Sequence, residues 1–154
     1  ARSEEQIAVL RSLWSEPAVT FNGRWHRIDA AGIKPRPVRN MIPVWIGGGA
    51  DVVLQRVARI GDGWFPQMRP DDAARLQIER LRAYMDVAGR PPEAVGIEAR
   101  LSLSQVPEQD WRAYAEAWRA LGATHLGINT MGMGLQSPQQ HLDLLHRAWN
   151  LLHT

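Results

Sequence analysis

Three consecutive glycines, Gly47, Gly48 and Gly49, are the residues of this chain whose type and spacing most clearly point to chemistry. They follow a short apolar run that starts at Pro43, and Asp51 stands where it can cap a helix beyond them. Glycines between a strand and a helix let backbone N–H groups approach an anion, whose charge the helix dipole favours. The spacing matches neither the dinucleotide fingerprint nor the P-loop. The segment therefore predicts either an anion site or a plain strand-to-helix turn.

Histidine, cysteine and serine give no support for a metal site or a nucleophile. The absence of Cys excludes a thiol nucleophile and a thiolate metal site. No two of the five histidines stand at the i, i+4 spacing of a helical zinc site, and no G-x-S-x-G elbow is present. We therefore expect no metal, and the catalytic residues remain unknown from the sequence.

The first 41 residues predict a helix, a hairpin and a linker. Residues 1–16 carry apolar side chains at helical spacing, and Ser3 with Gln6 has the form of a capping box. Residues 17–41 begin with two short runs typical of strands around Asn22-Gly23, a pair favoured in a two-residue type I′ turn. The remainder, with glycine and two prolines, predicts an extended linker.

Residues 42–154 predict four β–α units in succession. Strands are expected at 43–47, 64–67, 95–103 and 124–129. A helix follows each strand, and the last has Ser137 as N-cap, with Leu142, Leu145, Trp149 and Leu152 along its inward side. Repeated β–α units imply an α/β fold with a parallel sheet. A small doubly wound sheet and half of a (β/α)8 barrel, which needs roughly 250 residues in full, both satisfy the pattern.

A series of motifs in this chain resembles the luciferase-like monooxygenase family, in the family's own order. They occupy residues 10–14, 19–26, 32–38, 43–48 and 61–66, and residues 121–129 resemble the family's last barrel strand. The resemblance covers almost the whole chain, but only the C-terminal half of the family. It implies that the four β–α units are the last four of a TIM (β/α)8 barrel, with a β-hairpin insertion near the N-terminus.

The resemblance also implies a cofactor, reduced FMN or reduced coenzyme F-420, and residues that contact it. The backbone of Gly47, Gly48, Gly49 and Ala50 would hold the cofactor phosphate, and Gln67 would lie close to the cofactor or the substrate. In either architecture ligands bind at the carboxyl ends of the strands, where residues 47–51, 66–68, 102–105 and 129–131 are expected. Trp64 lies near that edge and is predicted to form a wall of the cofactor site.

Composition and charge indicate which classes of partner the protein is expected to lack. The chain has 154 residues, enough for one domain over 1–154, and no apolar run approaches the ~20 residues of a membrane span. The formal net charge is +2, and the high calculated pI reflects basic residues that are nearly all arginine and are interleaved with acids. We therefore expect no nucleic acid or membrane partner, and a cytoplasmic location.

These observations predict a flavin- or deazaflavin-dependent oxidoreductase domain whose cofactor carries hydride or oxygen chemistry on a small organic substrate. The sequence does not identify the substrate. A half-barrel leaves two sheet edges unpaired, so we expect a homodimer or a partner half-barrel. The alternative is a non-catalytic half-barrel fragment, or a self-associating α/β module that binds a phosphate ligand.

Overall fold

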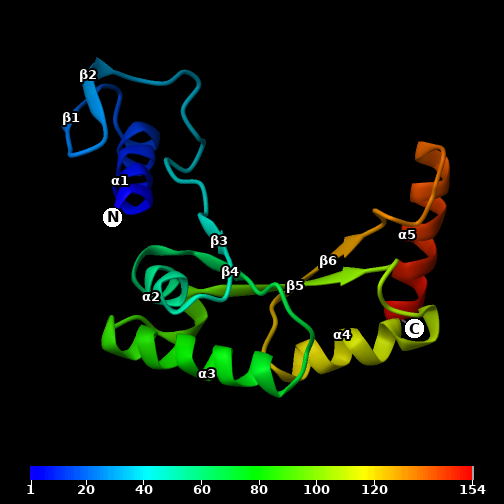
Figure 1. The fold of residues 1–154 in the computed structure, drawn as a ribbon. Coiled ribbons are helices and arrows are strands. Elements are labelled where there is room, and N and C mark those ends of the chain that lie inside the picture. The colour runs from blue at the N-terminus through cyan, green and yellow to red at the C-terminus, as the bar shows by residue number, and fades with distance from the viewer. Residues whose placement is uncertain (154) are drawn as a thin grey trace. The chain divides into compact units, whose positions relative to one another are not determined.

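The computed structural model describes residues 1–153 and forms two compact units, residues 1–44 and a second unit that begins at Trp45 (Figure 1). The boundary falls close to residue 42, where the β–α units were predicted to start. The expectation of a single domain over residues 1–154 stays a prediction. Each unit is described by itself.

The first unit contains helix α1 (Arg2–Ser15) and an antiparallel hairpin of β1 (Val19–Asn22) and β2 (Arg27–Ala31). The predicted capping box is wrong, because the helix already begins at Arg2 with Ala1 as N-cap and no side chain caps it. The predicted helix and hairpin are both present. Residues 32–44 lie outside helices and strands, as expected for a linker.

The hairpin turn differs from the predicted two-residue turn. Asn22 pairs with Arg27, so four residues, 23–26, connect the strands. The carboxylate of Glu5 accepts hydrogen bonds from the backbone N–H groups of Arg24, Trp25 and His26 at 2.7–2.9 Å. This distant carboxylate satisfies the loop donors, so the longer loop replaces the turn that the Asn-Gly pair favours locally.

Burial of the Glu5 carboxyl group raises its pKa, but hydrogen bonds outweigh this effect. The donors are the Trp25 N–H, the His26 ring, and the backbone N–H groups of His26 and Arg24. The pKa consequently falls from 4.5 to about 2. A carboxylate that receives several such bonds is strongly held in its charged form.

The second unit contains four β–α units. Its strands are β3 (Trp45–Gly47), β4 (Gly63–Phe65), β5 (Gly96–Ser102) and β6 (His125–Asn129). Its α-helices are α2 (Asp51–Ile60), α3 (Asp72–Val87), α4 (Trp111–Ala120) and α5 (Pro138–His153). Single 3₁₀ turns at Pro92–Ala94 and Glu108–Asp110 precede β5 and α4.

The sheet of the second unit is parallel, and its strands follow one another in the order β3-β4-β5-β6. Figure 1 shows α2, α3 and α4 on the same side of this sheet. A doubly wound sheet would reverse its strand order and carry helices on both faces. The fold is therefore that of a partial (β/α) barrel, and the predicted fold class is confirmed.

The outward face of the sheet forms the core together with the helices. Its buried members from the strands alternate with residues of the other face, and they include Trp64, Ile97, Ala99 and Leu101. On α3, the apolar residues Ala74, Ile78, Leu81 and Met85 pack against them and are also buried. Full burial of one large apolar side chain contributes about 1.5–3 kcal/mol, so this layer supplies most of the unit's stability.

On the inward face, the ring of Trp45 lies across two neighbouring strands. A Cβ on Gly63 would come within 2.1 Å of this ring, and one on Gly96 within 2.6 Å. The ring also meets His125 edge-on, with centroids 5.1 Å apart. Glycine is thus required at both positions because Trp45 closes this face at the amino-terminal end of the sheet.

Four helix ends follow local rules, and the N-terminus of α2 departs from them. Asp71 caps α3 through bonds to two backbone N–H groups, and Gly89 and Gly122 take positive φ angles just beyond α3 and α4. Ser137 and Gln140 form the reciprocal bonds of a capping box at α5. The predicted cap by Asp51 is wrong, because Ala50 is the N-cap of α2 and makes no side-chain cap bond.

The inward side of α5 agrees with the prediction only in part, since Leu152 packs against the core but other predicted members do not. Leu142 and Trp149 are exposed at 50% and 59%, whereas Ala148 is completely buried. The helix is therefore rotated so that Ala148, with Leu144 and Leu151 beside it, faces β5 and α4. The small alanine lets the helix approach these elements, a preference that apolar periodicity alone does not reveal.

Among residues 1–153, no helix is both long and apolar enough to cross a lipid bilayer.

Candidate functional site

The glycine segment, residues 47–50, connects the end of β3 to the first turn of α2. Gly48 has a φ of +114°, a conformation that side chains rarely adopt. Within residues 1–153, no acceptor bonds the backbone N–H groups of Ala50, Asp51 and Val52. Free N–H groups at a helix N-terminus are the donors that bind phosphate in other proteins.

Two side chains support the glycine segment from behind. The indole Nε1 of Trp64 donates a hydrogen bond of 2.7 Å to the carbonyl oxygen of Gly48. The amide of Gln77, on α3, lies where a Cβ on Gly49 would come within 2.8 Å of its Oε1. Gly49 allows this close approach of the Gln77 amide, and the segment is contacted by elements distant in sequence.

The structure corrects the expectation that Trp64 forms an open wall of the cofactor site. Its side chain is completely buried in the core between the sheet and the helices. It faces outward because its neighbours on β4, Gly63 and Phe65, face inward. Trp64 therefore supports the glycine segment from the core side.

Asp51 places a carboxylate in the first turn of α2, close to the free N–H groups. Its two oxygens accept hydrogen bonds from Tyr84 Oη at 2.6 Å and from Gln55 Nε2 at 2.8 Å. The guanidinium of Arg80 lies 3.8 Å away. The negative charge of Asp51 is thus engaged by side chains of α2 and α3, which leaves the N–H groups available.

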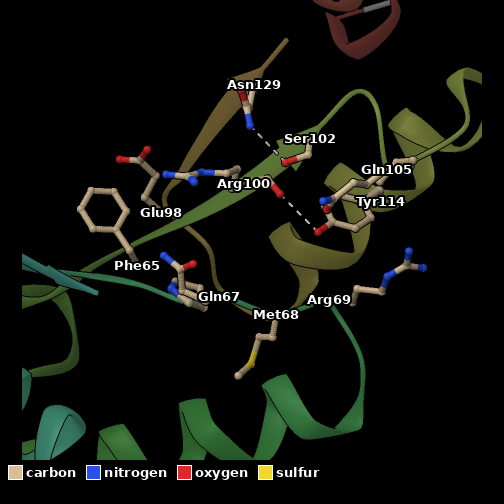
Figure 2. A pocket seen from close by; sticks show the side chains of 12 residues that line it. Phe65, Gln67, Met68, Arg69, Glu98, Arg100, Ser102, Gln105, Tyr114 and Asn129 are labelled. Atoms are coloured by element: carbon tan, nitrogen blue, oxygen red, sulfur yellow. Dashed lines mark hydrogen bonds between the residues drawn. The ribbon is translucent and has the colours of Figure 1, made fainter. Parts of the chain in front are cut away.

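A cavity of about 400 Å³ opens at the carboxyl end of β4, beside β5 (Figure 2). The two strands pair only from Gly63 to Trp64, whereas β5 and β6 pair along five residues. The lining residues come from the end of β4 and the loop after it, from β5 and the loop after it, from α4 and from the end of β6. They are Phe65, Pro66, Gln67, Met68, Arg69, Glu98, Arg100, Ser102, Gln105, Val106, Tyr114 and Asn129.

Three of the four segments predicted at the strand ends meet in this cavity. Gln67 and Met68 follow β4, Ser102 and Gln105 close β5, and Asn129 ends β6. Asn129 Nδ2 donates to Ser102 Oγ at 3.4 Å, as Figure 2 shows. The fourth segment, the glycines, adjoins the cavity through Gln67, because a Cβ on Gly47 would lie 3.9 Å from Gln67 Nε2.

Sequence reasoning missed the charged residues of β5 that line the cavity. Glu98 and Arg100, together with Ser102 from a predicted segment, alternate with apolar residues that face the core. This period-two pattern was visible in the sequence and places the three side chains on the inward face. Tyr114 and Arg69 could not have been found this way, because they reach the cavity from α4 and from a loop.

Within the part of the chain that the structure describes, no three His, Asp or Glu side chains are grouped as they would be to hold a metal ion. His125 bonds to Thr124 Oγ1 at 2.8 Å, and His141 bonds to Thr130 Oγ1 at 2.7 Å. The first contact holds the ring of His125 against its neighbour at the start of β6. Neither histidine lines the cavity.

Comparison with known proteins places the chain in a wider group. A family model described as luciferase-like monooxygenase matches residues 1–151. An F420-dependent glucose-6-phosphate dehydrogenase of Segniliparus rotundus is 34% identical over 145 residues, which cover 92% of this chain and 39% of that protein. An FMNH(2)-dependent dimethylsulfone monooxygenase of Pseudomonas fluorescens is 32% identical over 132 residues, 79% of this chain and 35% of that protein.

Solved structures show the same fold. The chain superposes on an F420-dependent secondary alcohol dehydrogenase in complex with an F420-acetone adduct with a TM-score of 0.55 at 14% identity. The match covers 95% of this chain and 51% of that one. The chain spans about a third of the length of the first curated relatives that it matches.

Proposed function

The chain belongs to the luciferase-like monooxygenase family, and from this membership we propose that it forms the cofactor-phosphate and substrate-pocket part of a flavin- or deazaflavin-dependent oxidoreductase. Its relatives include F420-dependent and FMNH(2)-dependent enzymes. The observation that carries the proposal is the junction at Gln67, which joins a glycine segment with free N–H groups to a polar cavity.

The residues of the glycine segment fit a cofactor phosphate. Gly47, Gly48, Gly49 and Ala50 present backbone without bulky side chains, and the N-terminus of α2 supplies unbonded donors. Reduced FMN and reduced coenzyme F-420 both carry such a phosphate, and either would supply the hydride or oxygen chemistry when bound. The chain's own contribution is to bind the phosphate and to orient the ring toward the cavity.

The cavity is the proposed place of a small organic substrate. Its lining combines Phe65, Met68 and Val106 with a larger set of polar groups from β5, β6 and α4. Gln67 lies between the glycine segment and this cavity, so its amide is placed to contact either the cofactor or the substrate. Glu98 is an acidic side chain in the lining and can exchange a proton with a bound ligand.

The proposal is tested by titrating the full-length protein with FMN and with F-420, and with each in its reduced form. Binding of one of them in the micromolar range, weakened when inorganic phosphate competes, supports the proposal. Absence of binding of both cofactors by the folded full-length protein contradicts it. Tight binding of one but not of the other decides between FMN and F-420.

The partner of this chain is proposed from its sheet edges. Strands β3 and β6 are the two edges of the parallel sheet, so their outer backbone groups lack strand partners within it. We propose that a further half-barrel covers them, either from the same protein or from a second copy. Light scattering on residues 1–154 alone should show a dimer or larger species, and a well-folded monomer at micromolar concentration contradicts this.

The alternative is a module that binds a phosphate ligand without catalysis, and the free donors of α2 are equally consistent with it. Turnover by the full-length protein with either reduced cofactor excludes this alternative. A cytoplasmic location stays a prediction.

A further inference from the structure

We infer that Trp64 is a positioning residue, whose indole N–H orients the glycine segment so that its backbone donors face the cofactor phosphate. The inference rests on the proposed function, because it takes the glycine segment as the phosphate site. It gives Trp64 a role different from the ring contact that its sequence position suggested.

The geometry of one peptide unit carries the argument. Trp64 Nε1 donates to the Gly48 oxygen at 2.7 Å, a short bond made by a side chain with no exposed surface. The C=O of Gly48 and the N–H of Gly49 belong to the same planar trans peptide, so they point in opposite directions. Holding the oxygen toward the buried indole therefore turns the Gly49 N–H away from the core.

This peptide needs an external restraint because glycines stand on both sides of it. Without Cβ atoms, Gly48 and Gly49 can rotate this unit into other orientations at little steric cost. The backbone hydrogen bond of Gly48, from its N–H to the Phe65 oxygen, is long at 3.4 Å. The Trp64 bond is thus the stronger contact that selects one orientation, and a preformed site binds more tightly than one that must be ordered.

The chain contains a matched control for this contact. Trp118 lies in the same core cluster, is 1% exposed, and its Nε1 is buried without a partner among the described residues. Trp64→Phe and Trp118→Phe both remove one indole from the same core. Only Trp64→Phe removes a hydrogen bond to the glycine segment, so the difference between the two variants measures that bond.

The experiment compares ligands with and without the phosphate in the full-length protein. Dissociation constants are measured for FMN and riboflavin, and for F-420 and its phosphate-free deazaflavin core. Trp64→Phe should weaken binding of the phosphorylated member of the relevant pair by about fivefold to tenfold, the effect of one hydrogen bond. Binding of the phosphate-free member should change by less than about twofold, and Trp118→Phe should alter neither preference.

Three results separate failure of the inference from failure of the proposed function. If the parent protein prefers the phosphorylated ligand and Trp64→Phe keeps that preference, the inference is overturned while the proposed function stands. Equal loss of preference in Trp118→Phe also overturns it, since general loosening of the core then explains the effect. If the parent does not discriminate between the members of either pair, the glycine segment is not a phosphate site. The inference and the proposed function are then both contradicted.

A second variant covers the case in which Trp64→Phe does not fold. Replacing Trp64 by benzothienylalanine keeps the shape of the bicyclic ring and puts sulfur in place of the N–H. The same loss of phosphate preference is expected from this variant. Unchanged preference with this isosteric side chain overturns the inference.

Discussion

Two turns of this chain present neighbouring backbone N–H groups, and they differ in what accepts the hydrogen bonds. In the hairpin loop of residues 23–26, the carboxylate of Glu5 occupies the donors. In the first turn of α2, no acceptor within the described residues bonds the N–H groups of Ala50, Asp51 and Val52. The hairpin loop shows such a cluster with its acceptor in place, and the turn of α2 leaves its donors for an acceptor from outside the described residues.

The electrostatic consequence is visible in the filled turn. The pKa of Glu5 falls to about 2 although burial opposes the charge, because several N–H groups and His26 donate to it. Successive backbone donors therefore favour a negative charge strongly enough to overcome desolvation. The same physics, applied to the glycine segment, is the reason to expect a phosphate there.

The largest expected effect is on turnover. It comes from testing residues 1–154 alone, which lack whatever the rest of the barrel contributes. Residues 1–154 alone should bind reduced FMN or reduced F-420 weakly and show no detectable turnover, while the full-length protein turns over. The phosphate donors lie in this chain, but misplacement of the ring by ~1 Å already costs about 100-fold in rate. Robust oxidation by residues 1–154, followed by cofactor absorbance, would mean that a complete site lies within them.

A second prediction concerns a variant in which the glycine turn receives a carboxylate, as the hairpin loop does from Glu5. Gly48→Asp should weaken binding of the phosphorylated cofactor by at least about tenfold relative to Gly48→Asn, since the added charge repels the phosphate. Both variants share the strain of a side chain at φ +114°, so their difference isolates charge. Equal dissociation constants, measured by fluorescence titration, would sink the phosphate assignment.

A third prediction concerns a weaker acceptor in the hairpin loop. Glu5→Gln should accelerate hydrogen exchange at the backbone amides of Arg24, Trp25 and His26 by about tenfold or more, because a neutral amide is a weaker acceptor. Exposed Glu16, at the end of α1, provides the control variant Glu16→Gln, which should leave these rates unchanged. Unaltered exchange in Glu5→Gln would show that the loop does not depend on the carboxylate.

The pH dependence of the same turn follows from the lowered pKa of Glu5. A group whose folded-state pKa is depressed stabilises the fold above its unfolded pKa, and this contribution is lost as the pH falls through the folded value. The parent loop should therefore keep its amide protection down to about pH 3 and lose it toward about pH 2. Protection that disappears already near pH 4.5 would contradict the strong hydrogen bonding of Glu5.

The smallest effect concerns packing behind the glycine turn. Gly49→Ala would bring its Cβ within 2.8 Å of Gln77 Oε1, but the end of this side chain can swing away. Affinity for the phosphorylated cofactor should fall by less than about threefold, a change within the range of small packing adjustments. Shortening the neighbour by Gln77→Ser should restore it. A loss as large as that of Gly48→Asp would show that Gln77 has a more direct role at the site.

The sequence determined those features that depend on neighbouring residues. The succession of four β–α units and the N-cap at Ser137 agree with the structure because periodicity and caps are local. The alternation of polar and apolar residues along β5 likewise predicts which of its side chains lie on the inward face. The glycine segment was found because few local contexts call for three glycines between a strand and a helix.

Only the tertiary structure decided which distant groups meet. The Asn22-Gly23 pair predicted a tight turn, but Glu5 stabilises a longer loop from another element. Trp64 turned out to face the core, and the cavity joins residues of three strands and α4. Such contacts depend on packing between elements far apart in sequence, where one buried hydrogen bond or one small residue outweighs a local preference.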